Sequence, residues 1–429
     1  MEAVAAAPVS SPRALLPASW PLWASFGMFP IAWLLGLGGF VWILVAVPMA
    51  FHLLARGTVE IPRGFGLYAL FLLWVLGSAT QLEGFDAALV FTYRLSLYAA
   101  AGVFFLYIYN EPPHRLPARE VVGALAAFWV VVTLGGFAGL IFPAVSLHTP
   151  LESAMPGMSS NEWLHDLVHV RFAQVQEFLG YPIARPSAPF PYTNMWGSSY
   201  SLLLPFALLV IARRSRSPWK APLLVLLAVS VVPAVLSVNR GLWLSVGLAL
   251  AYVAVRSFLS GRVRYVALVL LAGVVALVAV GITPLGDVVE ERLANQHSNR
   301  GRLSLYEQAI EGAAGAPLFG YGAPLPSENP RHPNVGTHGL FWMILVSHGI
   351  PAAVLFVTWL LLVLWRTRTA GTAVQLASNV VVFTGLVQIT FYGLLPGQLF
   401  IVMAAAGLAW RESAIARERR LAEPVGRER

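Results

Sequence analysis

The segment 265–282 reads YVALVLLAGVVALVAVGI and contains no charged side chain. A helix needs about 17–25 apolar residues to cross roughly 30 Å of hydrocarbon. Similar apolar windows recur along the whole chain of 429 residues, of which 58% are hydrophobic and 11% are charged. A soluble protein of this size would carry about 25% charged residues. The sequence therefore predicts an all-α, polytopic membrane protein.

We expect about twelve transmembrane helices in a single membrane domain that covers residues 1–429. Their expected limits are 20–36, 39–55, 64–80, 87–109, 121–142, 195–212, 221–238, 241–258, 265–282, 338–365, 374–394 and 397–410. The first two spans are joined by a tight turn from Gly36 to Gly39.

The charges predict the orientation of these spans. With the N-terminus inside, the inner segments hold 20 of the 28 basic residues, and every inner loop is basic, as the positive-inside rule requires. We therefore expect both termini in the cytoplasm, with 411–429 as a basic tail. The net charge of +8 then reflects topology, and we expect no nucleic-acid partner. The chain has no cysteine, which excludes thiolate metal sites and cysteine nucleophiles.

Two predicted extracytoplasmic loops are long enough to fold. In the first, 143–194, helical spacing of apolar residues after Asn161 predicts an amphipathic helix lying on the membrane or the bundle. The residues of its apolar face are Leu164, Leu167, Val168, Val175, Phe178 and Leu179.

The second and larger loop, 283–337, is expected to contain a helix near 299–314. Its expected apolar face is made of Leu303, Tyr306, Ile310 and Ala313. Arg302 would lie in the first turn, where an anion would meet both a guanidinium and the backbone N–H groups of a helix N-terminus.

Three residues at the outer ends of spans are candidates for chemistry. Arg240 follows a very short turn between two spans, and it could also be an arginine that extends to the interface. Arg302 could equally pair with Glu307 or Glu311 on the loop surface. His338 stands where the large loop returns to the membrane, and an imidazole there could exchange protons near neutral pH or simply be hydrogen-bonded.

The segments that hold these residues resemble the O-antigen ligase and polymerase superfamily. They are SVNRGLWLSVGLAL (237–250), GRLSLYEQAIEGAAGAPLFGYG (301–322) and THGLFWMILVSHGIPA (337–352). The resemblance covers about residues 225–360 and implies a GT-C-like membrane glycosyltransferase with one large outer loop. In this chain Gly339 follows the histidine, where many members have asparagine.

The resemblance implies roles for these residues. The donor would be a glycan on undecaprenyl diphosphate in the outer leaflet of the bacterial cytoplasmic membrane. Arg240 and Arg302 would bind the diphosphate, because the planar guanidinium pairs phosphate oxygens bidentately. His338 would take the proton of the acceptor hydroxyl. We expect no cofactor and no metal, and hence a metal-independent transfer with inversion at the anomeric carbon.

Other polar residues have weaker cases. Arg94 lies inside a span, where charge normally faces the bundle or a cavity, so it could bind the diphosphate or backbone carbonyls. Arg185 could reach the substrate or stabilise its loop, and Tyr306 shares a helix face with Arg302. His165 and His169 have the i, i+4 spacing of some zinc sites, but no third ligand is evident and a surface pair is favoured. His348 is expected to be a hydrogen-bonded core residue.

Gly320 and Gly322 are expected to serve a turn, because their spacing fits no phosphate-binding loop. Three functions remain open at this point: a ligase that moves a finished glycan to a glycan, lipid or protein acceptor, a polymerase of lipid-linked repeat units, and a transporter. The third is disfavoured, because proton-coupled transporters usually need acids inside spans and here the acids lie in loops or at span ends.

Overall fold

The described part of the chain is mainly a bundle of apolar helices. The structure is a computed structural model that describes residues 16–155, 157, 162–176, 181–213, 217–261, 263–283, 285–294, 297–326, 334–369 and 371–422. Within the helices at 263–281 and 297–315 some side chains, that of Arg302 among them, lie outside the description.

The N-terminal half contains, in chain order, α1 (Trp20–Leu22), the π-helix η1 (Trp23–Gly27), α2 (Phe29–Leu34), α3 (Val41–Ala55), α4 (Phe65–Gly77), the 3-10 helix η2 (Ser78–Gln81), α5 (Gly84–Asn110), α6 (Ala118–Ile141), β1 (Ser146–Leu147), α7 (Pro150–Ala154), α8 (Glu162–Val168), β2 (Val170–Arg171), β3 (Ala173–Gln176), β4 (Ile183–Pro186) and α9 (Thr193–Arg213). The C-terminal half contains α10 (Lys220–Val229), α11 (Val231–Leu236), α12 (Arg240–Leu259), α13 (Val263–Gly281), α14 (Leu285–Ala294), α15 (His297–Gly315), α16 (Leu340–Arg366), α17 (Ala373–Gln388) and α18 (Gln398–Ala422).

Each predicted span overlaps a helix or consecutive helices, although α17 ends at Gln388 and α18 continues to Ala422. Six described helices are long and apolar enough to cross a membrane: α5, α6, α9, α12, α16 and α18. Shorter apolar helices occupy 41–55, 65–81, 220–236 and 373–388. The multi-pass helical class is therefore confirmed, whereas the number twelve stays a prediction.

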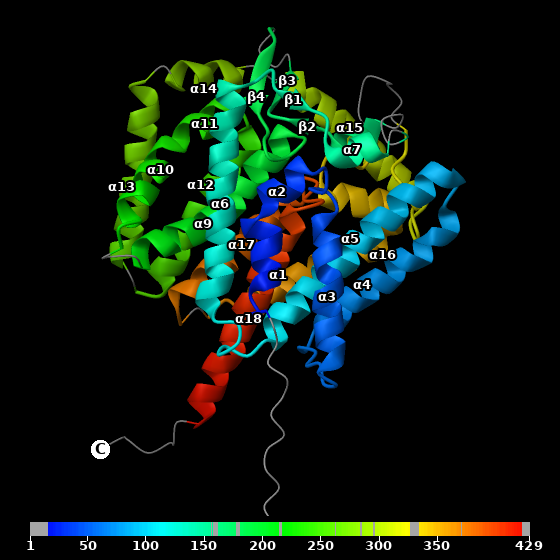
Figure 1. Ribbon diagram of the computed structural model, residues 1–429, viewed down its shortest axis with the longest axis horizontal. Coiled ribbons are helices and arrows are strands. Elements are labelled where there is room, and N and C mark those ends of the chain that lie inside the picture. Colours follow the sequence, from blue (N-terminus) through cyan, green and yellow to red (C-terminus); the bar gives the residue numbers. More distant parts are fainter. Residues whose placement is uncertain are drawn as a thin grey trace, which may run out of the picture.

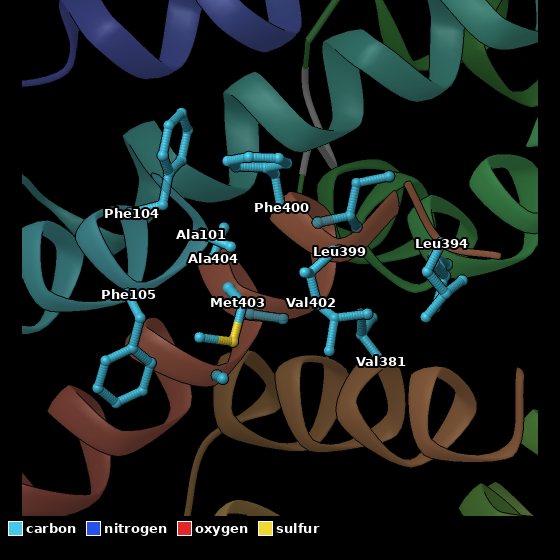
Figure 2. Packing of buried hydrophobic residues seen from close by; sticks show 14 of the residues in the cluster. Ala101, Phe104, Phe105, Val381, Leu394, Leu399, Phe400, Val402, Met403 and Ala404 are labelled. Carbon is cyan, nitrogen blue, oxygen red and sulfur yellow. The ribbon is translucent and has the colours of Figure 1, made fainter. Parts of the chain in front are cut away.

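Helix α18 is the centre of the bundle. In its apolar window 72% of the residues are buried, against 22% in α12, so other helices enclose α18 far more than α12 (both are labelled in Figure 1). Figure 2 shows Phe400, Met403 and Ala404 of α18 packed between Phe104 of α5 and Val381 of α17. Alanines in α18 let these neighbours approach closely, as in other membrane bundles.

Polar side chains also join the helices of this core. Gln388 of α17 donates to Ser201 of α9 (2.7 Å) and to Ser245 of α12 (2.9 Å). Gln398 of α18 donates to Ser199 of α9 at 2.8 Å. Because hydrocarbon offers no hydrogen bonds, these buried amides depend on neighbouring helices.

The segment 143–194, predicted as the first extracytoplasmic loop, is not purely helical in its described residues, which corrects the all-α expectation for this segment. Helix α8 ends at Val168, and the chain continues as strands, with β1 antiparallel to β2 and β3 antiparallel to β4. Val175, expected on an apolar helix face, is 61% exposed. Asn161, Phe178 and Leu179 lie outside the described residues.

Contact with α6 explains why strands replace the helix. A Cβ atom at Gly139 of α6 would lie 2.4 Å from the carbonyl oxygen of Phe172, and one at Gly135 would lie 2.3 Å from that of Ala188. The glycines therefore let extended backbone lie directly on α6, where the side chains of a helix would not fit.

The loop elements gather at one end of the molecule. In Figure 1 the strands, α7, α14 and α15 lie at one end, and the last turns of α18 lie at the other. Helix α1 also begins at the end away from the strands (Figure 1).

A buried carboxylate organises the end opposite the strands. Glu111, with a fully buried side chain, accepts from Arg56 Nη1 at 2.8 Å and lies 2.7 Å from His52 Nε2. Arg115 Nε is 3.7 Å from its other oxygen, and Arg411 Nη1 donates to its carbonyl oxygen at 3.0 Å. Glu111 therefore ties the ends of α3 and α5 to the middle of α18.

We predict that Glu111→Ala lowers the free energy of unfolding by about 3 kcal/mol, near the lower end of the range for buried pairs because Arg56 is partly exposed. Glu418→Ala, an exposed change in α18, is the control and should cost under about 0.5 kcal/mol. Unfolding of both variants in detergent measures the difference. Equal unfolding curves would show that Glu111 does not hold this end together.

Candidate functional site

Helix α16 is interrupted near its N-terminal end, and the loop predicted at 283–337 supplies hydrogen-bond partners there. Gly349 has φ +83° inside α16 and Pro351 follows, so the helical hydrogen bonding is broken there. The turn 317–322 supplies the missing partners. The N–H groups of Tyr321 and Gly322 donate to the carbonyl oxygens of residues 346 (3.1 Å) and 347 (2.8 Å), and the N–H of residue 350 donates to residue 317 at 2.8 Å.

The two glycines of this turn serve its backbone, as predicted. Gly320 and Gly322 have φ of +63° and +72°. A Cβ at Gly320 would lie 2.4 Å from the carbonyl oxygen of Val346 and 2.7 Å from the backbone nitrogen of His348. The turn is also held by Trp74 of α4, whose indole N–H donates to the carbonyl oxygen of residue 318 at 2.8 Å.

Helix α15 precedes the turn and corrects two predictions. It begins at His297, so Arg302 belongs to its second turn and does not stand among the N-terminal N–H groups. Its buried face consists of Leu305, Ala309 and Ala313, while Leu303 and Ile310 are exposed. The buried face differs from the predicted one because α15 packs against α16.

The segment entering α16 holds His338 in a half-buried position. Tyr306 of α15 stacks on Trp342 with ring centroids 4.7 Å apart, and its hydroxyl donates to the carbonyl oxygen of His338 at 3.4 Å. Thr337 Oγ1 lies 3.4 Å from His338 Nδ1. The contacts of Tyr306 thus link α15, which carries Arg302 one turn earlier, to His338.

Gly339 is required by its surroundings in this chain. Its φ is +147°, and a Cβ would lie 2.8 Å from the carbonyl oxygen of Thr390 and 2.9 Å from that of Ile389. An asparagine at this position, as in many proteins of the superfamily that the chain resembles, would therefore displace the backbone beside it. The position serves close packing here.

Arg240 is the first residue of α12 and is half-buried. The turn before it contains Val238 with φ +53°, an unusual value for a β-branched residue. Asn239 caps α12, because its side chain accepts from the N–H of Leu242 at 3.3 Å. The cap defines where the helix starts and thereby positions Arg240 at its N-terminus.

Tyr392 connects the residue before Arg240 to the first residue of α16. It lies in the irregular segment 389–397, where the structure departs from the predicted span 374–394 because α17 ends at Gln388. The Tyr392 hydroxyl donates to Asn239 Oδ1 at 2.6 Å, and its carbonyl oxygen accepts from the N–H of Leu340 at 2.8 Å. The neighbours of Arg240 and of His338 in the sequence are thus bridged by one residue.

Two further arginines hold the turn before Arg240. Arg185, 3% exposed, donates from Nε to the carbonyl oxygen of Ser237 at 2.6 Å and from Nη1 to Gln176 at 2.6 Å. Arg292 of α14, 4% exposed, donates from Nε to the carbonyl oxygen of Val238 at 3.2 Å. Sequence reasoning missed Arg292. Its basic side chain lies in a predicted extracytoplasmic loop, where few basic residues were expected, and this could have drawn attention to it.

Arg94 lies deeper, on α5. It is 9% exposed, and its Nη1 has no hydrogen-bond partner among the residues that the structure describes. The Arg94 guanidinium interacts electrostatically with the imidazole of His348. The Nδ1 atom of His348 lies 2.7 Å from Ser78 Oγ. His348 is therefore a hydrogen-bonded core residue, as predicted, and its Nε2 is buried without a described partner.

The comparison with protein families agrees with the resemblance seen in the sequence. Residues 225–357 match the O-antigen ligase family. The matched range includes Arg240, the whole of α15 with its turn, and His338. A comparison with curated proteins gives no match. The resemblance to the O-antigen ligase and polymerase superfamily is confirmed, and it supports a membrane glycosyltransferase of the ligase or polymerase kind.

We predict that Gly320→Ala prevents the turn from docking on α16, because the new methyl group meets backbone atoms that are themselves hydrogen-bonded. The yield of folded protein and its thermal midpoint in detergent should both fall. Gly247→Ala is the matched control, since a Cβ at Gly247 of α12 meets nothing within 4 Å and alanine favours a helix by about 0.5–1 kcal/mol. Similar behaviour of the two variants would contradict the close approach at Gly320.

Proposed function

We propose that the protein transfers a glycan from an undecaprenyl-diphosphate carrier to an acceptor hydroxyl at the outer face of the bacterial cytoplasmic membrane, with both termini in the cytoplasm. The observation that carries this proposal is the bridge through Tyr392, which brings the start of α12 and the entry of α16 together. These two places hold Arg240 and His338, a cation for a phosphate and a base for a hydroxyl.

Arg240 would bind the diphosphate of the donor. It stands at the N-terminus of a helix of twenty residues, where the helix dipole also favours an anion. Arg302 would contribute a second guanidinium from α15, and Arg94 a third cation from deeper in the bundle. Since guanidinium groups pair phosphate oxygens bidentately, they would stabilise the negative charge on the leaving diphosphate without a metal ion there.

His338 would act as the general base. The acceptor oxygen gives its proton to the imidazole as it forms a bond to the anomeric carbon. The bond between that carbon and the diphosphate oxygen breaks, and undecaprenyl diphosphate leaves with the electron pair. A single displacement of this kind inverts the anomeric configuration. Tyr306 would position His338 through its main chain, and Arg185 and Arg292 would position Arg240 by holding the turn before it.

We predict that Arg240→Ala, Arg302→Ala and His338→Ala each lower the rate of transfer by about 100- to 1000-fold, as for other groups that stabilise transition-state charge. The measurement is transfer by purified protein from a lipid-linked glycan to an acceptor, with unfolding curves recorded for each variant. Arg417→Ala and His114→Gln remove the same types of side chain at exposed positions and should be close to wild type. A His338→Ala enzyme with wild-type rate would eliminate the general-base role.

The metal-independence of the reaction centre has its own test. After treatment with EDTA, addition of Mg²⁺ or Mn²⁺ should leave the rate of transfer unchanged, because arginines would already neutralise the diphosphate. A rate that rises with either ion would show that a divalent cation takes part at the diphosphate.

Disruption of the gene should separate ligase from polymerase. A ligase is expected to leave lipid-linked polymer behind, because chains are completed but not transferred. A strain that accumulates single lipid-linked repeat units would instead identify a polymerase, with a second lipid-linked glycan as acceptor.

A further inference from the structure

Three histidines of the first outer loop surround one buried carboxylate. Glu152 lies in α7 and is 4% exposed. His148 precedes α7, His165 lies in α8, and His169 follows α8. The sequence suggested only the pair His165 and His169, because His148 and Glu152 come from a separate segment of the loop.

The atoms of this cluster are close to one another. His148 Nδ1 lies 3.0 Å from Glu152 Oε1, and His169 Nδ1 lies 2.9 Å from Glu152 Oε2. The three possible ligand atoms all lie within 4.8 Å of one another. His165 adds a further imidazole, with Nε2 3.4 Å from Glu152 Oε1 and its ring stacked on that of His169 at 4.5 Å.

These distances suit a zinc site. Four ligands at 2.0–2.1 Å from a tetrahedral Zn²⁺ ion are about 3.3–3.4 Å apart, close to the separations seen between the histidine nitrogens and the carboxylate. Imidazole and carboxylate are ligands that Zn²⁺ accepts, whereas Mg²⁺ and Ca²⁺ prefer oxygen alone.

The surroundings of the cluster also resemble those of metal ligands. Ser146 Oγ lies 2.6 Å from His169 Nε2, so the ring nitrogen remote from Glu152 already has an orienting partner. The two carboxylate oxygens of Glu152 face different imidazoles, Oε1 that of His148 and Oε2 that of His169, so the carboxylate lies between the nitrogens that would share the ion with it.

We propose that His148, Glu152 and His169, with His165 beside them, bind one Zn²⁺ ion that cross-links the first outer loop. Without metal, N–H groups of the same histidines donate to Glu152. With metal, the ion replaces these protons and joins α7, and His148 before it, to the chain that follows α8.

A site here would stabilise the loop where it meets the bundle. The N–H of Leu151 in α7 donates to the carbonyl oxygen of Leu35 at 3.3 Å, and a Cβ at Gly36 would lie 2.4 Å from Thr149 Oγ1. His169 also lines a small pocket together with Trp33 and Phe190. The cluster contains none of the residues to which the transfer reaction is assigned, so the ion would have a structural role.

Zinc binding by the full-length protein tests the proposal. Protein without a polyhistidine tag is stripped with chelator in detergent, desalted and titrated with ZnCl₂, and the bound metal is measured by elemental analysis and calorimetry. We expect one Zn²⁺ per chain. Ser146→Ala removes a partner of a ligand and should weaken zinc binding by roughly 10- to 100-fold. His148→Gln and His169→Gln remove ligands themselves and should weaken zinc binding at least as much.

The choice of variants separates binding from folding. The His148 side chain is 79% exposed, so His148→Gln should fold, and His114→Gln removes an exposed histidine elsewhere in the chain. Zinc should raise the thermal midpoint of the wild type and of His114→Gln but not that of His148→Gln. No bound zinc in the wild type, or equal binding by wild type, His148→Gln and His169→Gln, would overturn the proposal.

Discussion

The break in α16 at Gly349 is the constraint on which the end of the molecule that holds the candidate site depends. Hydrocarbon supplies no hydrogen bonds, so a broken helix inside a membrane-spanning segment needs protein partners for its exposed backbone groups. The turn 317–322 provides them, with Gly320 approaching α16 too closely for any other residue. The turn is thereby attached to α16 at a defined place, and α15, which leads into the turn, is positioned with it.

The candidate site follows from a second stretch of irregular backbone. Segment 389–397 has no regular helix, yet its residues 389 and 392 accept hydrogen bonds from the first N–H groups of α16, and the Tyr392 hydroxyl reaches the cap of α12. Arg185 and Arg292 hold the adjoining turn by its carbonyl oxygens. Arg240 and His338 are thus mounted on helix starts that are fixed by main-chain contacts, which suits residues that must meet a diphosphate and a hydroxyl in a defined geometry.

The two ends of the molecule use buried carboxylates in different ways. Glu111 lies beside Arg56, Arg115 and His52 and joins the ends of α3 and α5, so its charge is already balanced by protein. Glu152 is surrounded by histidines, whose imidazole nitrogens can exchange a proton for a metal ion. The same residue type therefore serves as an internal ion pair at one end and as a candidate metal ligand at the other.

The sequence by itself determined the membrane class, the positions of the apolar helices and the family resemblance, because these depend on local composition and on short motifs. It also indicated Arg240, Arg302 and His338 by their places at loop and span ends. Only the tertiary structure decided that extended backbone packs on the glycines of α6, which face of α15 is buried and where α17 ends. It also decided that Arg292 holds the turn before Arg240 and that His148 lies close to His169. Each of these depends on contacts between segments far apart in the chain, and local periodicity carries no information about which backbone will lie against a helix.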